Sequence, residues 1–237
     1  MDVKSRLIAF DFPVTTGELA VADSASLSMT DTLTIEYWLI TDVNTNGGQP
    51  NVVNKWHSGG GRSYAFHLQG ASNKTRMIVS EVAGGTTTMS RTSSTTINTG
   101  ERNHLAANAS ATADTISIFL NGVDDGGTTT GTVVSIYDST TDVTAGSDGF
   151  FNDFDGQIEE IRIWNIARTV DQITEFMFKR IRAPSAELVL YWRMDSALSS
   201  SGGAPETDYS NNGNNGTHAN TTFSAGLFPI AGGGASG

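Results

Sequence analysis

The strongest constraint on the fold is an alternation of apolar and polar residues with a period of two. In segment 32–41 (TLTIEYWLIT), one face carries Leu33, Ile35, Tyr37 and Leu39, and the other carries Thr34, Glu36, Trp38 and Ile40. Gly, Asn or Asp interrupts this alternation about every eight to twelve residues along the chain. Such a pattern is typical of short antiparallel strands in a sandwich or barrel and argues against a mainly helical fold.

Ten segments fit this pattern and are predicted to be strands. They are 6–10, 18–22, 32–41, 51–56, 63–68, 76–82, 104–109, 115–120, 158–164 and 188–193. Turns are predicted at 46–48, 59–61, 84–85 and 121–122, where Gly or Asn supplies the positive φ angles that tight connections require. The sequence therefore predicts an all-β domain with short connections.

One short helix is predicted near 169–180. Thr169 followed by Gln172 has the spacing of a capping box, and Val170, Ile173 and Met177 share one helical face. The basic run 179–182 (KRIR) has two readings, a recognition patch or a complement to the negative end of the helix dipole. We favour the second.

Charge and composition narrow the function. The chain has 14 basic and 25 acidic residues, a formal net charge of −11, and no cysteine. Nucleic-acid binding is disfavoured because it needs a basic surface, and disulfides, thiolate zinc sites and cysteine nucleophiles are excluded. No stretch has the apolar length of a secretory signal or of a membrane span after Met1. We therefore expect synthesis in a cytoplasm and no membrane span.

Six stretches carry a more specific pattern. They are 26–38 (SLSMTDTLTIEYW), 52–56 (VVNKW) with 63–66 (SYAF), 116–122 (ISIFLNG), 154–168 (FDGQIEEIRIWNIAR), 188–195 (LVLYWRMD) and 208–217 (DYSNNGNNGT). In this order they resemble the laminin-G-like branch of the concanavalin A-like lectin/glucanase family. One departure is Asn103-His104, where that family often has Trp-His. The resemblance implies a two-sheet antiparallel jelly-roll sandwich over residues 1–195. Segment 196–237 is then an Asn/Gly-rich extension packed on the domain or on a neighbouring subunit.

The glucanases of this fold carry Glu-x-Asp-x-x-Glu on one strand, which aims the carboxylates into a cleft. The comparable cluster here is 153–160 (DFDGQIEE), where Gly156 is predicted to break the strand before Glu159. No metalloprotease, P-loop or Gly-x-Ser-x-Gly pattern is present. The scattered histidines, such as His67 on the strand face opposite Phe66, are interpreted as structural. The sequence thus predicts a non-catalytic protein, with a glycoside hydrolase as a less favoured alternative.

The resemblance also implies a structural calcium ion that ties the first strand to the closing one. Asp11 and Glu159 stand at the acidic positions of that pattern. The alternative is that Asp11 makes a turn contact and Glu159 is solvated.

Candidate ligand-binding residues are Glu36 with Trp38, and Arg162 with Trp164, because each pair shares one strand face. An aromatic ring and a polar group side by side can stack on a sugar and hydrogen-bond to it. The alternative interpretation places Trp38 and Trp164 in the core.

These observations lead to three function classes. The first choice is a non-catalytic structural or adhesive protein of a virion, such as a phage capsid or tail decoration. It would be made in a host cytoplasm, displayed on the virion surface, oligomeric, and bound to other protein subunits and to a cell-surface glycan. The small-residue tail 232–237 (GGGASG) would be held by a neighbouring subunit. The alternatives are an extracellular carbohydrate-binding adhesin module of a bacterium, and a hydrolase.

Overall fold

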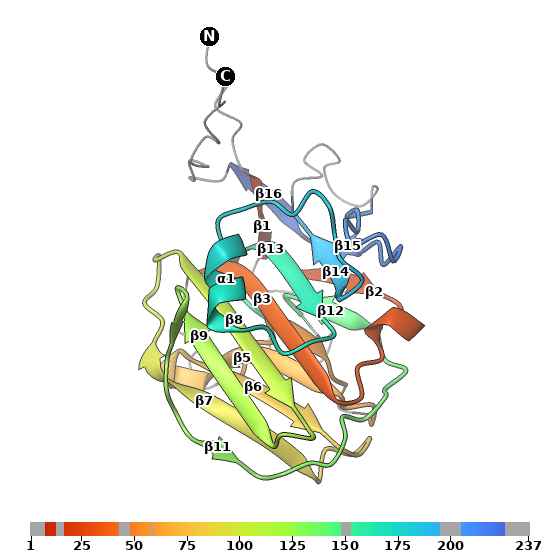
Figure 1. Cartoon of the computed structure of the whole chain (residues 1–237). Helices are drawn as coiled ribbons and strands as arrows, with labels where there is room; N and C mark the ends of the chain where they lie inside the picture. Colours follow the sequence, from red (N-terminus) through yellow and green to blue (C-terminus); the bar gives the residue numbers. More distant parts are fainter. Residues whose placement is uncertain are drawn as a thin grey trace, which may run out of the picture.

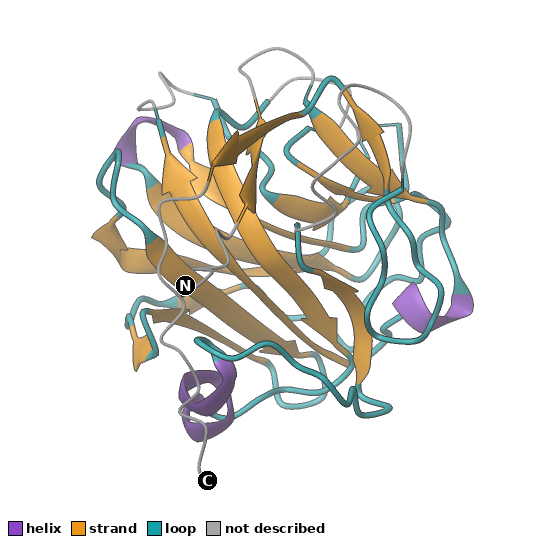
Figure 2. Ribbon diagram, turned by 90° about the horizontal axis from the view of Figure 1, so that it is seen from above, coloured by secondary structure: helices purple, strands orange, loops and turns teal. Residues whose placement is uncertain are grey.

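The computed structural model describes residues 8–12, 17–42, 48–57, 59–147, 153–194 and 205–225. Two antiparallel sheets of eight strands each stack face to face, and the α-helix of the described chain lies outside the sandwich (Figures 1 and 2). This confirms the predicted all-β jelly-roll sandwich with one short helix. Among the described residues, no helix has the length and hydrophobicity needed to cross a membrane.

Sheet A has the order β10-β9-β8-β3-β13-β1-β16, and β14 pairs with the second half of β13. Its strands are β1 (Ile8–Phe12), β3 (Thr32–Thr41), β8 (Asn103–Ser110), β9 (Thr115–Leu120), β10 (Val123–Asp124), β13 (Gly156–Trp164), β14 (Leu188–Trp192) and β16 (Thr222–Ala225). The register between β3 and β13 shifts between Glu159 and Arg162. At this bulge Glu160 has a φ of 53°, so one extra residue fits between the inward-facing Ile158 and Ile161.

Sheet B has the order β11-β7-β6-β5-β4-β12-β2-β15. Its strands are β2 (Glu18–Val21), β4 (Val53–Lys55), β5 (Tyr64–Gln69), β6 (Lys74–Ser80), β7 (Thr88–Thr96), β11 (Thr129–Thr130), β12 (Val143–Ala145) and β15 (Thr217–Ala219). Two 3₁₀ turns, η1 (Ala25–Leu27) and η2 (Gly70–Ser72), connect strands. β2, β4 and β12 become neighbours here although long stretches of chain separate them.

The core lies between the sheets and is built by the predicted alternation. Ile35 and Tyr37 of β3, Ile118 of β9 and Ile161 of β13 are fully buried, as is Phe66 of β5 in the facing sheet. Because the side chains of each strand alternate, the polar members of these strands point away from this core. Which of those outward faces is covered decides where a ligand can bind.

Helix α1 (Val170–Phe176) covers part of the outer face of sheet A. Its predicted capping box is confirmed, because the Thr169 side chain accepts from the Gln172 N–H and the Gln172 side chain accepts from the Thr169 N–H. The predicted end near residue 180 was too late. The side chain of Arg162, on β13, donates hydrogen bonds to the carbonyls of Phe176 and Lys179. These carbonyls at the C-terminal end of the helix therefore find their partner in the sheet and not in a further helical turn.

The described part of the C-terminal extension is built into the sandwich. β15 pairs with β2 at the edge of sheet B, and β16 pairs with β1 at the edge of sheet A. The predicted tail 232–237, and most of the predicted turn 46–48, lie outside the described residues.

Candidate functional site

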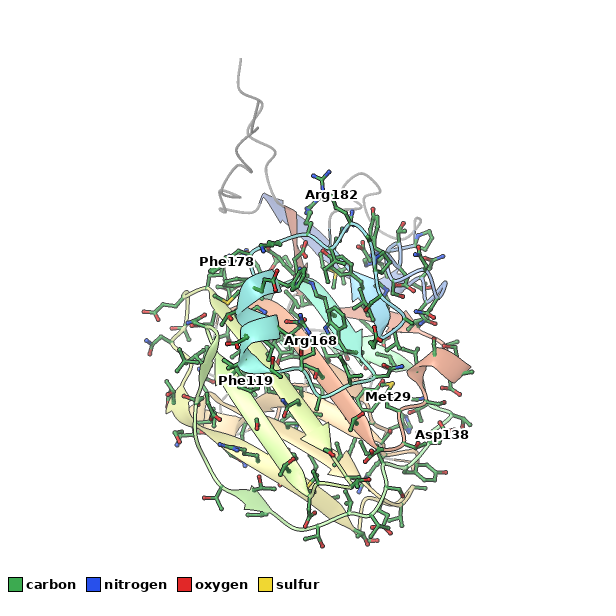
Figure 3. The ribbon with its side chains drawn as sticks, in the orientation of Figure 1. Met29, Phe119, Asp138, Arg168, Phe178 and Arg182 are labelled. Atoms are coloured by element: carbon green, nitrogen blue, oxygen red, sulfur yellow. The ribbon has the colours of Figure 1, made fainter. Side chains whose placement is uncertain are left out.

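The four ligand-binding residues predicted from the sequence do lie together on the outer face of sheet A. Cross-strand pairing puts Arg162 opposite Glu36, while Trp38 and Trp164 flank them on β3 and β13. All four are buried, however, with exposed fractions of 7% or less. Segment 165–187, which carries α1, covers them; Figure 3 places Arg168 beside α1 and Phe178 near its C-terminal end.

Glu36 is the centre of this buried group. Its Oε1 accepts from Trp164 Nε1 at 2.6 Å and from Arg168 Nη1 at 2.5 Å, and its Oε2 lies 3.5 Å from His104 Nε2. Burial alone would raise the pKa of Glu36, but His104, Arg162 and Arg168 outweigh it and lower that pKa to about 2. The carboxylate is therefore ionised, and its Oε1 is occupied by two protein donors, while its Oε2 has His104 as its neighbour.

Trp38 and Arg162 also use their polar atoms within the protein. Trp38 Nε1 donates to the carbonyl of Met177 at 2.9 Å. Arg162 donates to Glu160 at 2.7 Å and to the carbonyls of Phe176 and Lys179. The four predicted residues thus fasten segment 165–187 to the sheet. A sugar reaches them only if this segment moves away, so their role in ligand binding stays a prediction.

The predicted calcium ligands are not arranged as a shared site. Glu159 Oε2 lies 3.2 Å from Arg102 Nη2, and a cation would have to displace that guanidinium. Asp11 faces Asp42 and Asp155 instead; burial and these two charges raise its pKa. No group of three or more His, Asp or Glu side chains in the described part of the chain could hold a metal ion. Calcium binding by Asp11 and Glu159 does not fit this arrangement and stays a prediction.

Segment 153–160, which is the part of the chain most similar to the glucanase motif, also has its glutamates bound to protein partners. The sequence predicted a strand break at Gly156 before Glu159; in the structure Gly156 is instead the first residue of β13, which continues through Glu159, and Asp153 and Asp155 precede the strand. Glu160 accepts from Arg162 and from Tyr191 Oη at 2.5 Å, and Glu159 contacts Arg102. These carboxylates are buried against cations rather than open to a cleft.

An accessible pocket of about 300 Å³ lies instead on the outer face of sheet B, over β4, β12 and β2. Its lining residues are Glu18, Asn54, Trp56, His57, Thr141, Asp142 and Thr144. Asn54 pairs with Thr144 across β4 and β12, and Trp56 and Asp142, which lie just outside these two strands, both line the pocket. Trp56 is partly exposed, and Arg62 lies 5.7 Å from the centre of its ring.

Hydrogen bonds fix the floor of this pocket. Asn54 donates from Nδ2 to Thr144 Oγ1 at 2.9 Å and accepts from the backbone N–H of Trp56 at 3.1 Å. His57 Nδ1 accepts from the N–H of Gly59 at 3.1 Å, so the proton of the neutral ring is on Nε2. The pocket therefore combines an aromatic face, a ring N–H donor and two carboxylates, which suits a ligand that carries both an apolar face and hydroxyl groups.

Sequence reasoning placed Trp56 at the end of a strand but did not select it as a ligand residue. Its partners Glu18 and Asp142 are distant in the chain, and only the order β4-β12-β2 brings them together. The available signal was that Asn54 and Trp56 share one strand face, the same criterion that selected Glu36 and Trp38.

A second pocket of about 370 Å³ is lined by Ser, Thr, Asn and small side chains around Met29, with Asp31 as its charged residue and without an aromatic ring. Asp31 accepts there from the N–H of Thr112. This pocket lacks the surface on which a sugar ring could stack, so the pocket beside Trp56 is the better candidate.

Comparison with known proteins agrees with this fold. A laminin-G-type family model described as the concanavalin A-like lectin/glucanases superfamily matches residues 14–174. A search of curated proteins by sequence finds no match. Among solved structures, the chain is similar to a protein of Bacteroides ovatus ATCC 8483 for which carbohydrate binding has been suggested. That match has a TM-score of 0.71 and 18% identity, and covers 95% of this chain and 62% of the other.

Two further structures are similar. A heptameric SAP-like pentraxin from Limulus polyphemus has a TM-score of 0.55 and 16% identity, with 73% of this chain and 82% of the other covered. Domain 4 of an extracellular arabinanase from Geobacillus stearothermophilus, solved with arabinotriose, has a TM-score of 0.52 and 18% identity, with 70% and 75% covered. These identities establish a common fold. Since the family model matches more than half of the sequence, the chain belongs to the concanavalin A-like lectin/glucanases superfamily, in its laminin-G-like branch.

Proposed function

We propose that this chain is a non-catalytic, lectin-like module that binds a saccharide in the pocket beside Trp56. The observation that carries the proposal is a partly exposed indole surrounded by polar side chains in a cavity of about 300 Å³. An indole face supplies apolar area at small entropic cost, while Asp142, Glu18 and His57 can exchange hydrogen bonds with ring hydroxyls.

The carboxylates beneath segment 165–187 and in the Trp56 pocket support the non-catalytic part of the proposal. A retaining glycosidase needs two accessible carboxyl groups about 5 Å apart, and an inverting one needs room for a water between them. Glu159 and Glu160 are buried beside arginines, and Glu36 is buried beneath segment 165–187. In the register of β2 and β12, Glu18 and Asp142 are displaced from each other by four residues along the strand direction. This displacement corresponds to about 13 Å.

The similar structures favour carbohydrates over other ligands. One was solved with arabinotriose, and carbohydrate binding has been suggested for another. This chain spans 62% of the Bacteroides ovatus protein, so we propose for it only the binding role, and no activity of a longer protein.

Isothermal titration with arabinotriose and a panel of neutral oligosaccharides tests the proposal. We expect millimolar to micromolar binding of at least one member, and at least a tenfold loss of affinity in Trp56→Ala. The matched control is Phe178→Ala, which removes an exposed aromatic side chain near α1 on the other sheet. Equal affinity of Trp56→Ala and the unmodified protein would show that this pocket is not the binding site.

The finer roles expected from the sequence remain predictions of their own. They are adhesion as a virion decoration protein, oligomeric assembly with other subunits, display on a virion surface or outside a bacterium, and a structural calcium ion. None of them is required for saccharide binding at Trp56. Size-exclusion chromatography with light scattering tests assembly directly, since a monomer at high concentration contradicts it.

A further inference from the structure

Arg76, on β6, is a cation without an acidic partner on the outer face of sheet B. Its neighbour Met77 is fully buried in the core, so the alternation of β6 directs Arg76 outward. The guanidinium is half-buried, which lowers the pKa of Arg76, yet no carboxylate pairs with it in the described part of the chain. Its Nη2 donates to Ser90 Oγ at 3.0 Å. The remaining N–H donors of this partly dehydrated cation are available to an anion.

His67 is the cross-strand neighbour of Arg76. The two residues pair directly in the register of β5 and β6, so their side chains lie on the same face. His67 is only 4% exposed, and among the described residues neither ring nitrogen has a hydrogen-bond partner. Burial, with a smaller contribution from Arg76, lowers the pKa of His67 to about 3. The ring is therefore neutral at pH 7 and has one N–H donor without an acceptor.

Neutral groups on β7 fix the position of the guanidinium. Ser90, which accepts from Arg76, is itself buried and lies 3.3 Å from Thr130 Oγ1 on β11. Thr92 pairs with Arg76 in the register of β6 and β7, and its Oγ1 donates to Gln69 Oε1 at 3.0 Å. These partners orient Arg76 without neutralising its charge, which leaves a preformed site for an anion.

The register also relates Arg76 to the pocket beside Trp56. Asn54 of the pocket floor pairs with Ala65, and Ala65 pairs with Ile78. Arg76 lies two residues from Ile78 along β6. The two sites are thus separated by two strand spacings, about 10 Å, across sheet B and by about 7 Å along it. An oligosaccharide of a few units is long enough to contact both.

We propose that Arg76, with His67 beside it, forms a second subsite on the outer face of sheet B, which binds the carboxylate of a uronic acid unit in an oligosaccharide. This rests on the proposed function for the rest of the ligand. A planar carboxylate matches the fork of a guanidinium and accepts charge-assisted hydrogen bonds from it. The formal net charge of −11 opposes an anionic ligand, but salt screens that repulsion beyond about 10 Å, whereas Arg76 acts at contact distance.

Isothermal titration with matched pairs tests the inference, using short uronate-containing oligosaccharides and the methyl esters of the same chains. We expect the unmodified protein to bind at least one acid at least tenfold more tightly than its ester. Arg76→Gln should reduce this advantage to within threefold, and His67→Leu should reduce it by at least threefold. The matched control is Arg182→Gln, which makes the same charge change at an exposed residue of segment 165–187, on the side of sheet A (Figure 3).

The charge and the fork of Arg76 are separated by a further variant. Arg76→Lys keeps the positive charge without the planar donor pair, so it should retain only part of the advantage. Urea denaturation at pH 7 checks that each variant is folded, and Arg76→Lys carries the test if Arg76→Gln is not. A full tenfold advantage in a folded Arg76→Gln, or in Arg76→Lys when Arg76→Gln does not fold, overturns the subsite. An equal loss in Arg182→Gln also overturns it, because the effect would then be one of net charge.

The outcomes for the two proposals are distinct. Equal affinity of the unmodified protein for acids and esters overturns the carboxylate subsite and leaves saccharide binding at Trp56 intact. Acid binding that is lost in Arg76→Gln but unchanged in Trp56→Ala supports the subsite and overturns the proposed pocket. Absence of binding to every acid and every neutral oligosaccharide overturns both.

Discussion

Trp164 donates its indole N–H to the Oε1 of Glu36 at 2.6 Å, although the two residues are 128 positions apart in the chain. The contact joins β13 to β3 beneath segment 165–187, where Arg168 donates to the same oxygen. The buried Glu36 carboxylate accepts from both Trp164 and Arg168. It stabilises the fold chiefly because neither of these buried donors is left without an acceptor.

Replacing Glu36 by Ala should therefore lower the free energy of unfolding by about 3–5 kcal/mol, because Arg168 and Trp164 would be left buried without their acceptor. Urea denaturation at pH 7 measures the loss. The matched control is Glu175→Ala, since this carboxylate is 59% exposed and forms an exposed ion pair with Lys179 at 3.5 Å. It should cost less than about 1 kcal/mol. Equal losses for the two variants would contradict the central role of Glu36.

A second prediction concerns the contribution of three core isoleucines to the free energy of unfolding. Ile35, Ile118 and Ile161 are fully buried between the sheets, which confirms the strand faces predicted from the sequence. Each Ile→Ala replacement should lower the free energy of unfolding by about 2–5 kcal/mol through lost burial and a residual cavity. Losses below about 1 kcal/mol at all three positions would contradict this packing.

His67 links stability to pH. Burial, with a smaller contribution from Arg76, lowers its pKa from 6.5 to about 3. The unfolded chain therefore binds a proton at His67 between pH 6.5 and 3 when the native state does not, and stability is lost as the pH falls through this window. Neither ring nitrogen has a hydrogen-bond partner among the described residues.

We accordingly expect His67→Leu to be at least as stable as the unmodified protein at pH 7 and to lose less stability between pH 6.5 and 4.5. Glu36, with a pKa of about 2, loses its contribution only below about pH 4.5. His104 and His218, whose pKa values burial also lowers, and Glu159 change protonation in the upper window in both proteins, so the difference between the two slopes reports His67. Thermal melts at half-unit pH steps measure both slopes. Parallel curves for the two proteins would show that His67 finds a partner when folded.

Much of the fold could be predicted from alternation alone, because inward apolar residues and Gly or Asn turns are local signals. Segment 32–41 coincides with β3, and Asn121 and Gly122 have the positive φ angles expected of a tight turn. Strand β7 (TMSRTSSTT) was missed because Ser and Thr occupy nearly all of its positions, which leaves no apolar period to detect.

The candidate site could not be predicted in the same way. Alternation indicates which residues share a face, but not whether another segment covers that face. Glu36 and Trp38 satisfied the criterion and are covered by segment 165–187, whereas Asn54 and Trp56 satisfied it equally and line an accessible pocket. The distinction depends on where α1 packs and on the order of β4, β12 and β2, both of which are long-range properties.

Glu159 gives a prediction of the opposite sign to that of His67. Burial raises its pKa from 4.5 to about 7, with Arg102 acting against this. The native state therefore holds a proton at Glu159 between pH 4.5 and 7 when the unfolded chain has released it, so stability falls as the pH rises through that window.

Glu159→Gln keeps an acceptor for Arg102 and removes the buried charge. We expect this variant to be more stable than the unmodified protein at pH 8, by about 1–3 kcal/mol, and to match it near pH 4.5. Urea denaturation at both pH values measures the difference. A variant that is less stable at pH 8 would show that the ion pair with Arg102 outweighs the cost of burying the carboxylate.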